Sequence, residues 1–330
     1  MELTERQLFL LIVAFCGITC CFSQEQQGDI VIVSDFTPPA IYVAALGPRL
    51  NFKQVNVDGG RRNISAPAVV DFDPVERRIY WSQWARAENG EGFIARCDLQ
   101  GRFYQVLIRN LEYALGLALD TVGRKMYFSH EGMALEVANL NGNNRRTLIR
   151  ELPTSALFVF FDSVGKRVYV SDSTKQTVES IKLDGSNRTI HIDGADGLVH
   201  PSGVIVDRKA RRIFYSDFGT DRIAATNLRG EKGYTLYQYP LVSTETDPHA
   251  MAMTSQNELY WIDRNHPRLQ KIPKNVRPGQ IVVPKEVGNK EFGWPSGLHI
   301  YQAGGSEGLK SASLVMYLVV PMIFKFLLNQ

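Results

Sequence analysis

Histidines and carboxylates are the residues of this 330-residue chain with which it could hold a metal ion or carry out catalysis. Imidazole nitrogens are common zinc ligands, and three histidines lie in polar segments between apolar runs: His130, His200 and His249. Calcium prefers oxygen ligands, and a second set offers them: Glu112, Glu131, Asp247, Asp263 and Asn265. Neither set recurs with the spacing of a metal site. We therefore expect no catalytic residue, no resident metal and no cofactor, with calcium as the one ion left open.

Aromatic, histidine and arginine side chains of the same segments suggest a different chemistry, the binding of a protein or peptide. These residue types dominate the hot spots of protein interfaces. Packing between neighbouring elements is the alternative for several of them, and for Trp294 above all. The candidate binding residues are Phe36, Trp84, Arg86, Tyr113, His130, Glu131, His200, Phe218, His249, Arg264 and Trp294.

The elements that must position these side chains repeat along the chain. In Val204–Phe218 an apolar run ends in Asp207, a charged turn follows, and a β-branched and aromatic run begins at Ile213, which reads as strand, turn, strand. The second residue of the aromatic run recurs at intervals of 48, 47, 42, 45 and 46 residues, namely at Ile32, Tyr80, Tyr127, Tyr169, Phe214 and Tyr260. A period in the forties with four strands per unit is typical of a β-propeller blade. Six copies predict an all-β, six-bladed propeller over residues 28–302.

The first copy lacks an inner strand, and the missing strand is found at the other end of the chain. Residues 294–300 repeat the pattern of residues 200–206, so we expect the C-terminal strand to complete the first blade. Ring closure of this kind removes two exposed sheet edges. Glycines near the end of each third strand predict tight hairpin turns with positive φ. They are Gly59, Gly101, Gly142, Gly185 and Gly230.

The aromatic runs resemble those of the LDL-receptor class B, or YWTD-repeat, propellers. The matching segments are Ile79–Gln83, Met126–His130, Val168–Asp172, Ile213–Asp217 and Leu259–Asp263. An aspartate precedes the aromatic residue by seven positions in four copies, with a basic pair between them. The resemblance implies a six-bladed ring in which Asp207, Arg211 and Phe214 are scaffold. It covers the whole predicted domain, but no copy reads Tyr-Trp-Thr-Asp in full, and the sixth has lost the aspartate and the basic pair.

The N-terminal segment predicts secretion. A weakly basic start is followed by an apolar stretch from Leu8 to Phe22 and a small residue, Ser23, so residues 1–23 have the form of a signal peptide. A short membrane anchor is the alternative. Three of the four cysteines lie in this segment, which leaves Cys97 as an odd thiol that we expect to be buried. Sequons at Asn63 and Asn187 predict N-glycosylation.

The C-terminal residues 303–330 have the pattern of a glycolipid-anchor signal. Gly304, Gly305 and Ser306 are the expected attachment site, a polar spacer follows, and Leu314–Leu328 is an apolar tail with one lysine. A single-pass helix is the alternative, although the tail is shorter than the roughly 20 residues that span a bilayer. A formal charge of +3 is too small to favour nucleic acid as a partner.

These observations predict an extracellular or cell-surface protein whose propeller binds a protein or peptide ligand. Two other functions remain open. One is a carrier of a small ligand or ion in the central channel. The other is a hydrolase like the calcium-dependent lactonases and esterases, which also use six-bladed propellers.

Overall fold

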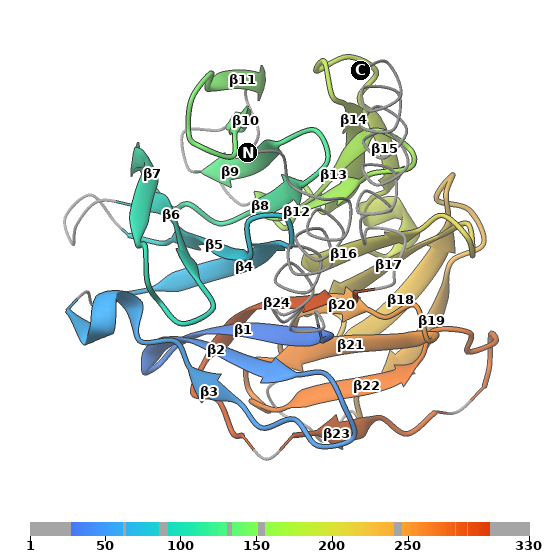
Figure 1. The fold of residues 1–330 in the computed structure, drawn as a ribbon. Coiled ribbons are helices and arrows are strands. Elements are labelled where there is room, and N and C mark those ends of the chain that lie inside the picture. Colours follow the sequence, from blue (N-terminus) through green and yellow to red (C-terminus); the bar gives the residue numbers. More distant parts are fainter. Residues whose placement is uncertain are drawn as a thin grey trace, which may run out of the picture.

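The chain folds into six four-stranded antiparallel sheets, which Figure 1 shows arranged as the blades of a propeller. A computed structural model describes residues 28–61, 64–85, 92–130, 134–150, 156–240, 246–280, 282–288 and 290–303. Two short 3₁₀ segments, η1 (Val57–Gly60) and η3 (Gly194–Asp196), are the helical elements of this part. The predicted all-β, six-bladed fold is therefore confirmed.

Each blade has an inner, a second, a third and an outer strand. The first two blades contain β24 (Pro295–Tyr301), β1 (Ile30–Phe36), β2 (Pro39–Ala45) and β3 (Lys53–Gln54), then β4 (Pro67–Asp73), β5 (Arg78–Gln83), β6 (Gly92–Asp98) and β7 (Gln105–Leu111). The next two contain β8 (Leu117–Asp120), β9 (Lys125–His130), β10 (Ala134–Asn139) and β11 (Arg146–Ile149), then β12 (Ala156–Asp162), β13 (Arg167–Asp172), β14 (Thr177–Lys182) and β15 (Thr189–Ile192). The last two contain β16 (Pro201–Asp207), β17 (Arg212–Asp217), β18 (Arg222–Asn227) and β19 (Tyr234–Gln238), then β20 (Pro248–Met253), β21 (Glu258–Asp263), β22 (Leu269–Pro273) and β23 (Lys285–Val287).

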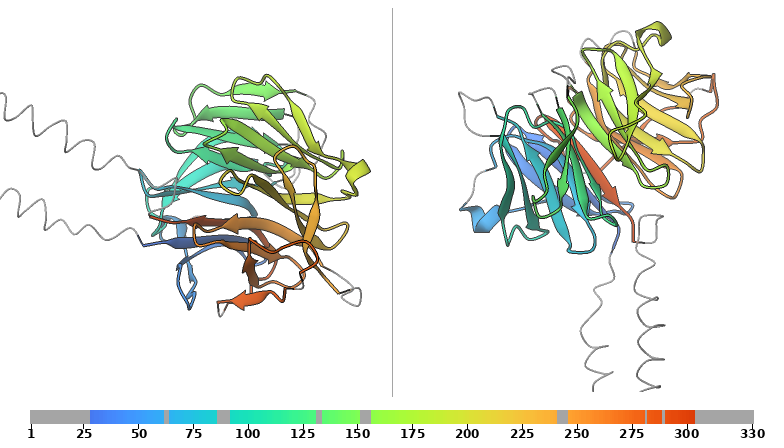
Figure 2. Two further views of the ribbon diagram at one scale, coloured as in Figure 1. Left: turned by 90° about the vertical axis from the view of Figure 1, so that its right-hand side faces the viewer. Right: turned by 90° about the horizontal axis from the view of Figure 1, so that it is seen from above.

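The C-terminal strand closes the ring as the sequence predicts. Strand β24 pairs antiparallel with β1, with Leu298 opposite Val33 and Tyr301 opposite Ile30. Beyond the strands, the backbone N–H of Ala303 donates to the Asp29 carboxylate at 2.9 Å. The two described ends of the chain therefore meet in the first blade, on one side of the propeller (Figure 2).

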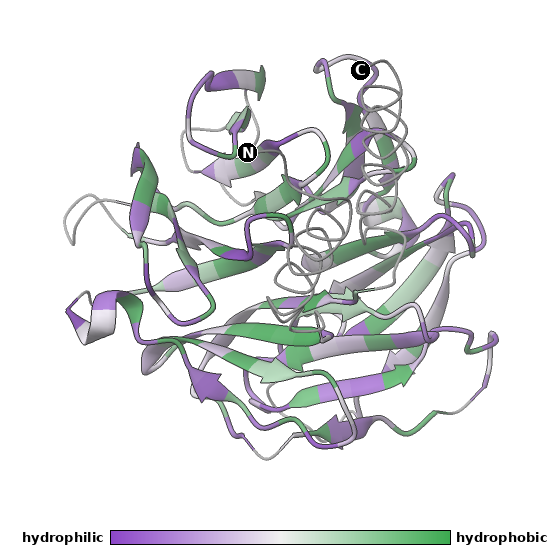
Figure 3. Ribbon diagram, viewed as in Figure 1, coloured by the Kyte–Doolittle hydropathy of each residue, from purple (hydrophilic) through white to green (hydrophobic). Residues whose placement is uncertain are grey.

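The core lies between adjacent blades because the inner strands are covered on both faces. All seven residues of β16 are buried, whereas only one of the four residues of the outer strand β15, Ile192, is buried. Apolar residues concentrate in the inner strands and polar ones in the loops (Figure 3). The largest buried side chains come from the aromatic runs of the repeats: Trp81, Trp261, Tyr80, Tyr169, Phe128 and Phe214. Burial of each such side chain stabilises the fold by on the order of 2 kcal/mol.

Serines of the second strands connect each blade to the next. Ser82 Oγ donates to the carbonyl of Leu115 at 3.1 Å, and Ser216 Oγ donates to that of His249 at 2.7 Å. Ser34 and Ser171 likewise donate to carbonyls of the next blade, those of Ala68 and Ser202. The sixth blade has Ile262 at this position, a fully buried apolar side chain, so hydrophobic packing replaces the hydrogen bond there.

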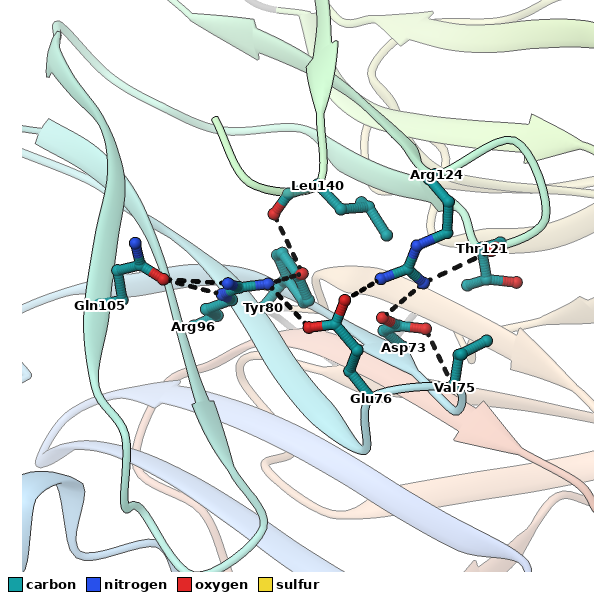
Figure 4. Close-up of polar contacts among 9 residues, drawn as sticks. All are labelled: Asp73, Val75, Glu76, Tyr80, Arg96, Gln105, Thr121, Arg124 and Leu140. Carbon is teal, nitrogen blue, oxygen red and sulfur yellow. Dashed lines mark hydrogen bonds and ion pairs between the residues drawn. The ribbon is translucent and has the colours of Figure 1, made fainter. Parts of the chain in front are cut away.

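Three of the four repeated aspartates connect neighbouring blades, in agreement with a scaffold role. Arg211, which the resemblance also assigned to the scaffold, is exposed, and Arg208 makes the inter-blade pair instead. Asp73 is fully buried and accepts from Arg124 of the third blade at 2.7 Å. Figure 4 shows this pair joined to Glu76, Tyr80 and Arg96, with the Tyr80 hydroxyl donating to the carbonyl of Leu140.

Two further aspartates make the same kind of contact through different partners. Asp162 pairs with Arg208 of the fifth blade. Asp207 pairs with Lys274 of the sixth blade at 2.5 Å. Since the sixth copy has lost its basic pair, Lys274 supplies the missing cation from the turn between the third and outer strands.

Four of the five predicted hairpin glycines adopt positive φ where a third strand turns into an outer strand. Gly101, Gly142, Gly185 and Gly230 have φ between 80° and 92°. Each also lies against the backbone of the preceding blade, so that a Cβ at Gly230 would sit 1.5 Å from the carbonyl oxygen of His191. The prediction for Gly59 is wrong, because it lies in η1, after the outer strand β3.

Cys97 is fully buried in β6, as predicted, opposite Ile79. Burial raises the pKa of its thiol to about 12. The thiol is therefore protonated at physiological pH and unreactive.

Candidate functional site

Two groups of loops lie on the same face of the ring because the strands of a blade alternate in direction. The loops that lead into inner strands and those that follow second strands form what we call the aromatic face. The turns from inner to second strands and from third to outer strands form the opposite face, which we call the turn face. Most of the candidate binding residues belong to the aromatic face.

Four aromatic side chains form a continuous chain across the first three blades of this face. The rings of Tyr113 and Trp84 meet edge to face with centroids 5.2 Å apart, and Trp84 meets Phe36 at 6.2 Å. Phe36 in turn contacts Trp294 at 6.0 Å. Phe36, Trp84 and Tyr113 are partly buried, whereas Trp294 is 49% exposed. Rings held by one another in this way lose little freedom when a partner covers them.

Arg264 extends this chain toward the sixth blade. Its guanidinium carbon lies 5.4 Å from the Trp294 ring centroid, within the range of a cation–π contact, and its Nη1 lies 3.5 Å from Asp247 Oδ2. Burial lowers the pKa of Arg264, although Asp247 opposes the effect. Its buried Nε has no hydrogen-bond partner among the described residues. A buried N–H group without a partner can donate a hydrogen bond to a ligand oxygen at low cost, because no internal hydrogen bond has to be broken.

The loops that carry these side chains are fixed by buried carboxylates at the ends of the second strands. Asp35 accepts from the backbone N–H groups of Trp294 at 2.7 Å, Gly293 at 2.8 Å and Thr37 at 3.1 Å. Gly293 is required there, since a Cβ would lie 1.2 Å from the carbonyl oxygen of Thr37. Asp217 and Asp263 end their segments in the same way and also accept hydrogen bonds from the backbone of neighbouring loops.

The fifth blade presents a separate aromatic pair. His200 and Phe218 stack with centroids 5.0 Å apart and planes 13° from parallel. Asp217 holds the His200 loop by accepting from its backbone N–H at 2.8 Å, and Ser173 bonds the imidazole Nδ1 at 3.1 Å. His200 is exposed and Phe218 is partly buried. This pair does not touch the Tyr113–Trp294 chain through any ring contact among the described residues.

His249 does not belong to the exposed surface, contrary to the sequence prediction. It is 3% exposed, bonds Ser202 Oγ through Nδ1 at 2.8 Å, and packs edge to face on Phe158 at 5.0 Å. Burial, together with the nearby charge of Arg264, lowers its pKa to about 4 against the pull of Asp247. His249 is therefore a neutral residue of the interior beneath the Arg264–Asp247 pair. His249 is buried because it lies on an inner strand, β20.

His130 is likewise directed into its own blade. Its Nε2 lies 3.6 Å from Glu136 Oε1, and its ring lies over Phe128. The glutamate also binds Arg145. Although burial opposes the effect, these two partners lower the pKa of Glu136 to about 2. His130 therefore contributes to the third blade more than to a shared binding surface.

The described residues do not bring the proposed metal ligands together. His130, His200 and His249 have separate partners, and among the described residues no group of three or more His, Cys, Asp or Glu side chains is placed to hold a metal ion. Asp263, one of the proposed oxygen ligands, uses Oδ1 to accept from the backbone of Asp247, Asn265 and His266.

Several predicted positions lie outside the described residues: Arg86, Glu131, Asn63, Gly304, Gly305 and Ser306. Asn187 is described, and it is exposed at a turn with φ of 54°. In the part of the chain that the structure covers, no helix is long and apolar enough to cross a membrane.

The sequence did not reveal two features of the site. The role of Asp35 was hidden because its partners, Gly293 and Trp294, lie about 260 residues away. Phe158 was missed because it lies within an apolar strand, where nothing distinguishes it from core residues. One feature of the sequence could have pointed to Asp35. It occupies the last position of the aromatic run in the first copy, where the fourth, fifth and sixth copies also have aspartate.

Comparison with known proteins supports this architecture. The fold resembles a chain of the nidogen/laminin complex with a TM-score of 0.68 at 21% identity, over 84% of this chain and 99% of that one. It also resembles a streptogramin B lyase with a TM-score of 0.57 at 12% identity, over 83% and 84%. Identities this low establish the fold alone. The chain is a six-bladed β-propeller, a fold that occurs in both binding proteins and enzymes.

Sequence comparison shows which propeller-containing proteins this chain is similar to. The chain is 26% identical over 189 residues to a vitellogenin receptor of Solenopsis invicta, which is 56% of this chain and 10% of the receptor. It is 26% identical over 226 residues to low-density lipoprotein receptor-related protein 5 of Homo sapiens, which is 66% and 13%. No family model matches. The predicted resemblance to YWTD-repeat propeller proteins is confirmed, and the chain spans about a tenth of the length of these two relatives.

Proposed function

We propose that this protein is a cell-surface binding protein whose aromatic face takes an extracellular protein or peptide ligand. One observation carries the proposal, namely the continuous surface of Tyr113, Trp84, Phe36, Trp294 and Arg264. Aromatic and arginine side chains held rigidly around a recessed cation are the usual composition of a hot spot. The buried Asp35 carboxylate holds the backbone of Trp294, and Asp247 pairs with Arg264, before any ligand arrives.

The relatives agree with this proposal. Two are named as receptors or receptor-related proteins, and the structural neighbour comes from a protein–protein complex. Because the chain covers a small share of the receptors, their ligands are not transferred to it. The carrier and hydrolase alternatives gain no supporting observation from the described residues.

The test is affinity capture of extracellular proteins by the intact chain. The substitutions Trp84→Ala, Tyr113→Ala and Phe218→Ala, made together, remove three rings of the aromatic face. We expect the captured partner to be lost, since hot-spot side chains each contribute about 2 kcal/mol or more. The matched control is Phe103→Ala, which removes a 69% exposed ring from the turn face. Unchanged capture by the triple variant would show that the partner binds elsewhere.

The proposal includes secretion and attachment to the membrane. We infer cleavage of the leader near Ser23, glycosylation at Asn63 and Asn187, and a glycolipid anchor at Gly304–Ser306. Phospholipase treatment of intact cells tests the anchor. Release of the protein supports it, whereas retention together with an intact 314–328 segment supports a spanning helix. Glycosidase treatment followed by gel electrophoresis tests the glycosylation. We expect the treatment to increase the mobility of the protein, and Asn187→Gln to make this shift smaller.

A further inference from the structure

A cavity of about 320 Å³ lies between the fourth and fifth blades. Ile192 of β15 and Asp196 of η3 line it on the side of the fourth blade, and Tyr215 of β17, Arg222 of β18 and residues 230–235 line it on the side of the fifth. Ile192 and Tyr215 are buried and form its floor, whereas Asp196 is exposed, so the cavity opens to solvent. Its volume lies at the small end of the range of about 300–1,000 Å³ that is usual for ligand pockets.

The cavity is present because the fifth blade lacks a large side chain that the preceding blades have. In the second to fifth blades, the third residue after the hairpin glycine is Tyr104, Arg145, Arg188 and Gly233 in turn. The Tyr104 ring stacks on Trp81, with centroids 5.9 Å apart. Trp81 and Tyr215 hold the same place in their second strands, so Gly233 leaves open space beside Tyr215 where the second blade has a ring.

A small residue of the third strand enlarges the same space. In the third and fourth blades, the residues opposite the second strand at this level are Glu136 and Glu179, which pair with Arg145 and Arg188. In the fifth blade this position, opposite Tyr215, is Ala224. The fifth blade therefore has neither the ion pair nor the ring that occupies this space in its predecessors, although protein interiors are normally closely packed.

Two hydroxyl groups at the cavity have no hydrogen-bond partner among the described residues, those of Tyr215 and Thr235. Tyr215 is only 4% exposed, and buried tyrosine hydroxyls usually have a partner, as that of Tyr80 has in the carbonyl of Leu140. Burial raises the pKa of Tyr215, although the charge of Arg222 opposes the effect. The Tyr215 hydroxyl therefore keeps its proton at physiological pH, and it is available both to donate to a ligand and to accept from one.

The charged groups that line the cavity balance one another. They are two cations and two carboxylates: Arg222, Lys232, Asp196 and Glu231. Arg222 is further compensated by the fully buried Asp217, whose Oδ2 lies 3.7 Å from its Nη2. The same Nη2 donates to the carbonyl of Gly197 at 2.8 Å, which fixes the guanidinium. Because an ion loses its hydration on entering a cavity and needs an unbalanced opposite charge in return, this lining favours a neutral polar ligand.

We propose that this cavity binds a neutral sugar unit. A sugar presents several hydroxyl groups, each of which can donate and accept a hydrogen bond. The cavity offers partners for both roles, since its guanidinium and ammonium groups donate, its carboxylates accept, and the hydroxyls of Tyr215 and Thr235 do both. The site lies between the outer strands β15 and β19 (Figure 1) and shares no lining residue with the Tyr113–Trp294 chain, so it is independent of the proposed ligand surface.

Saturation-transfer NMR on the full chain tests the proposal. The protein is held in a detergent that contains no sugar and is treated with an N-glycosidase, so that its own glycans do not compete. The probes are glucose, galactose, mannose, fucose and N-acetylglucosamine, each also as its methyl glycoside. We expect at least one of these neutral sugars to receive saturation from the protein. Binding of a methyl glycoside indicates the end of a glycan chain as the natural ligand, and binding of the free sugar alone indicates a monosaccharide; both results support the proposal.

Two substitutions assign the binding to the cavity. Tyr215→Phe removes the unpaired hydroxyl but keeps the ring, and it should weaken binding about tenfold. Gly233→Tyr introduces the ring that Tyr104 supplies in the second blade, and it should abolish binding. A Cβ at Gly233 has room, since the nearest atom that it would meet is the carbonyl oxygen of Ala225 at 3.9 Å.

The matched control is Tyr237→Phe. This tyrosine belongs to the same blade but packs on Trp261 of the sixth blade, with ring centroids 5.9 Å apart. The control should bind the sugar as the wild type does. Melting temperatures of the three variants show that each is folded.

The absence of saturation transfer to every neutral probe, or transfer that survives both Tyr215→Phe and Gly233→Tyr, would overturn the proposal. Glucuronate and glucosamine serve as comparators of similar size and opposite charge. Binding of either one without any neutral sugar would show an ionic site and also overturn it. Protein capture is measured on Gly233→Tyr and should be retained, because the cavity and the aromatic face share no residue; either proposal can therefore fail while the other stands.

Discussion

Replacing Lys274 by Met should destabilise the propeller far more than an ordinary loss of a surface lysine. Lys274 Nζ lies 2.5 Å from Asp207 Oδ2, and the side chains are 13% and 5% exposed. The substitution leaves the Asp207 carboxylate buried between the fifth and sixth blades with only backbone donors, such as the N–H of Ala210 at 2.9 Å. Breaking a buried pair from one side costs about 3–5 kcal/mol. Because backbone hydrogen bonds remain, we expect about 3 kcal/mol.

The effect should depend on pH. Burial alone raises the pKa of Asp207, but the hydrogen bond and charge of Lys274 and the backbone donors lower it below its ordinary value of 3.8. A carboxyl with a lowered pKa in the folded state contributes stability at pH values above its unfolded pKa, and this contribution is lost as the pH falls through the folded value. The cost of Lys274→Met should therefore be largest at pH 7 and smaller near pH 4, where the unpaired carboxyl can be protonated.

Urea unfolding followed by tryptophan fluorescence measures this cost. The matched control is Lys209→Met, which removes an exposed lysine two residues from Asp207 and should cost less than about 0.5 kcal/mol. The double change Asp207→Asn with Lys274→Met removes the buried charge and should recover part of the loss. If Lys274→Met and Lys209→Met had equal unfolding midpoints, the assignment of Lys274 as an inter-blade contact would be wrong.

Two further predictions concern stability. His249 has a pKa of about 4 when folded and an ordinary value of 6.5, so its contribution is complete above pH 6.5 and is lost as the pH falls toward 4. At pH 5 the loss lowers the free energy of unfolding by about 2 kcal/mol. His249→Gln should therefore reduce the difference between unfolding free energies at pH 7 and pH 5, and an unchanged difference would argue against a buried neutral imidazole. Gly230→Ala should lower the melting temperature more than Gly59→Ala. Both have positive φ, which costs about 1 kcal/mol, but only at Gly230 does the added Cβ meet backbone, the His191 carbonyl oxygen. Equal melting temperatures would contradict this steric argument.

Much of the fold could be predicted from sequence because it depends on a repeated pattern. The spacing of Tyr80, Tyr127, Tyr169 and Phe214 predicts the blades, and the repeated segment at 294–300 predicts the closing strand. Both predictions rest on local residue types, and the contacts between strands and blades favour the same structure. Gly59 was misassigned because the first blade has a short outer strand and a longer loop before it, so the spacing used for the other copies does not apply.

The site could be predicted only in part. Loop position identifies Phe36, Trp84, Tyr113 and Trp294 as neighbours on one face, and the structure brings them into contact. Loop position does not show how deep a side chain lies, and for this reason His249 was taken for a surface residue. The partners of Arg264 and Lys274 depend on the ring's closure and on contacts between blades, which no local pattern encodes.

Photo-crosslinking is the most direct test of ligand binding by the aromatic face. A photoreactive phenylalanine analogue is placed at Phe36, within the chain of aromatic rings, or at Phe103, an exposed phenylalanine of the turn face. Both versions are displayed on cells with the captured partner present. We expect a crosslink to the partner from position 36 and none from position 103. A crosslink from position 103 alone would contradict the account.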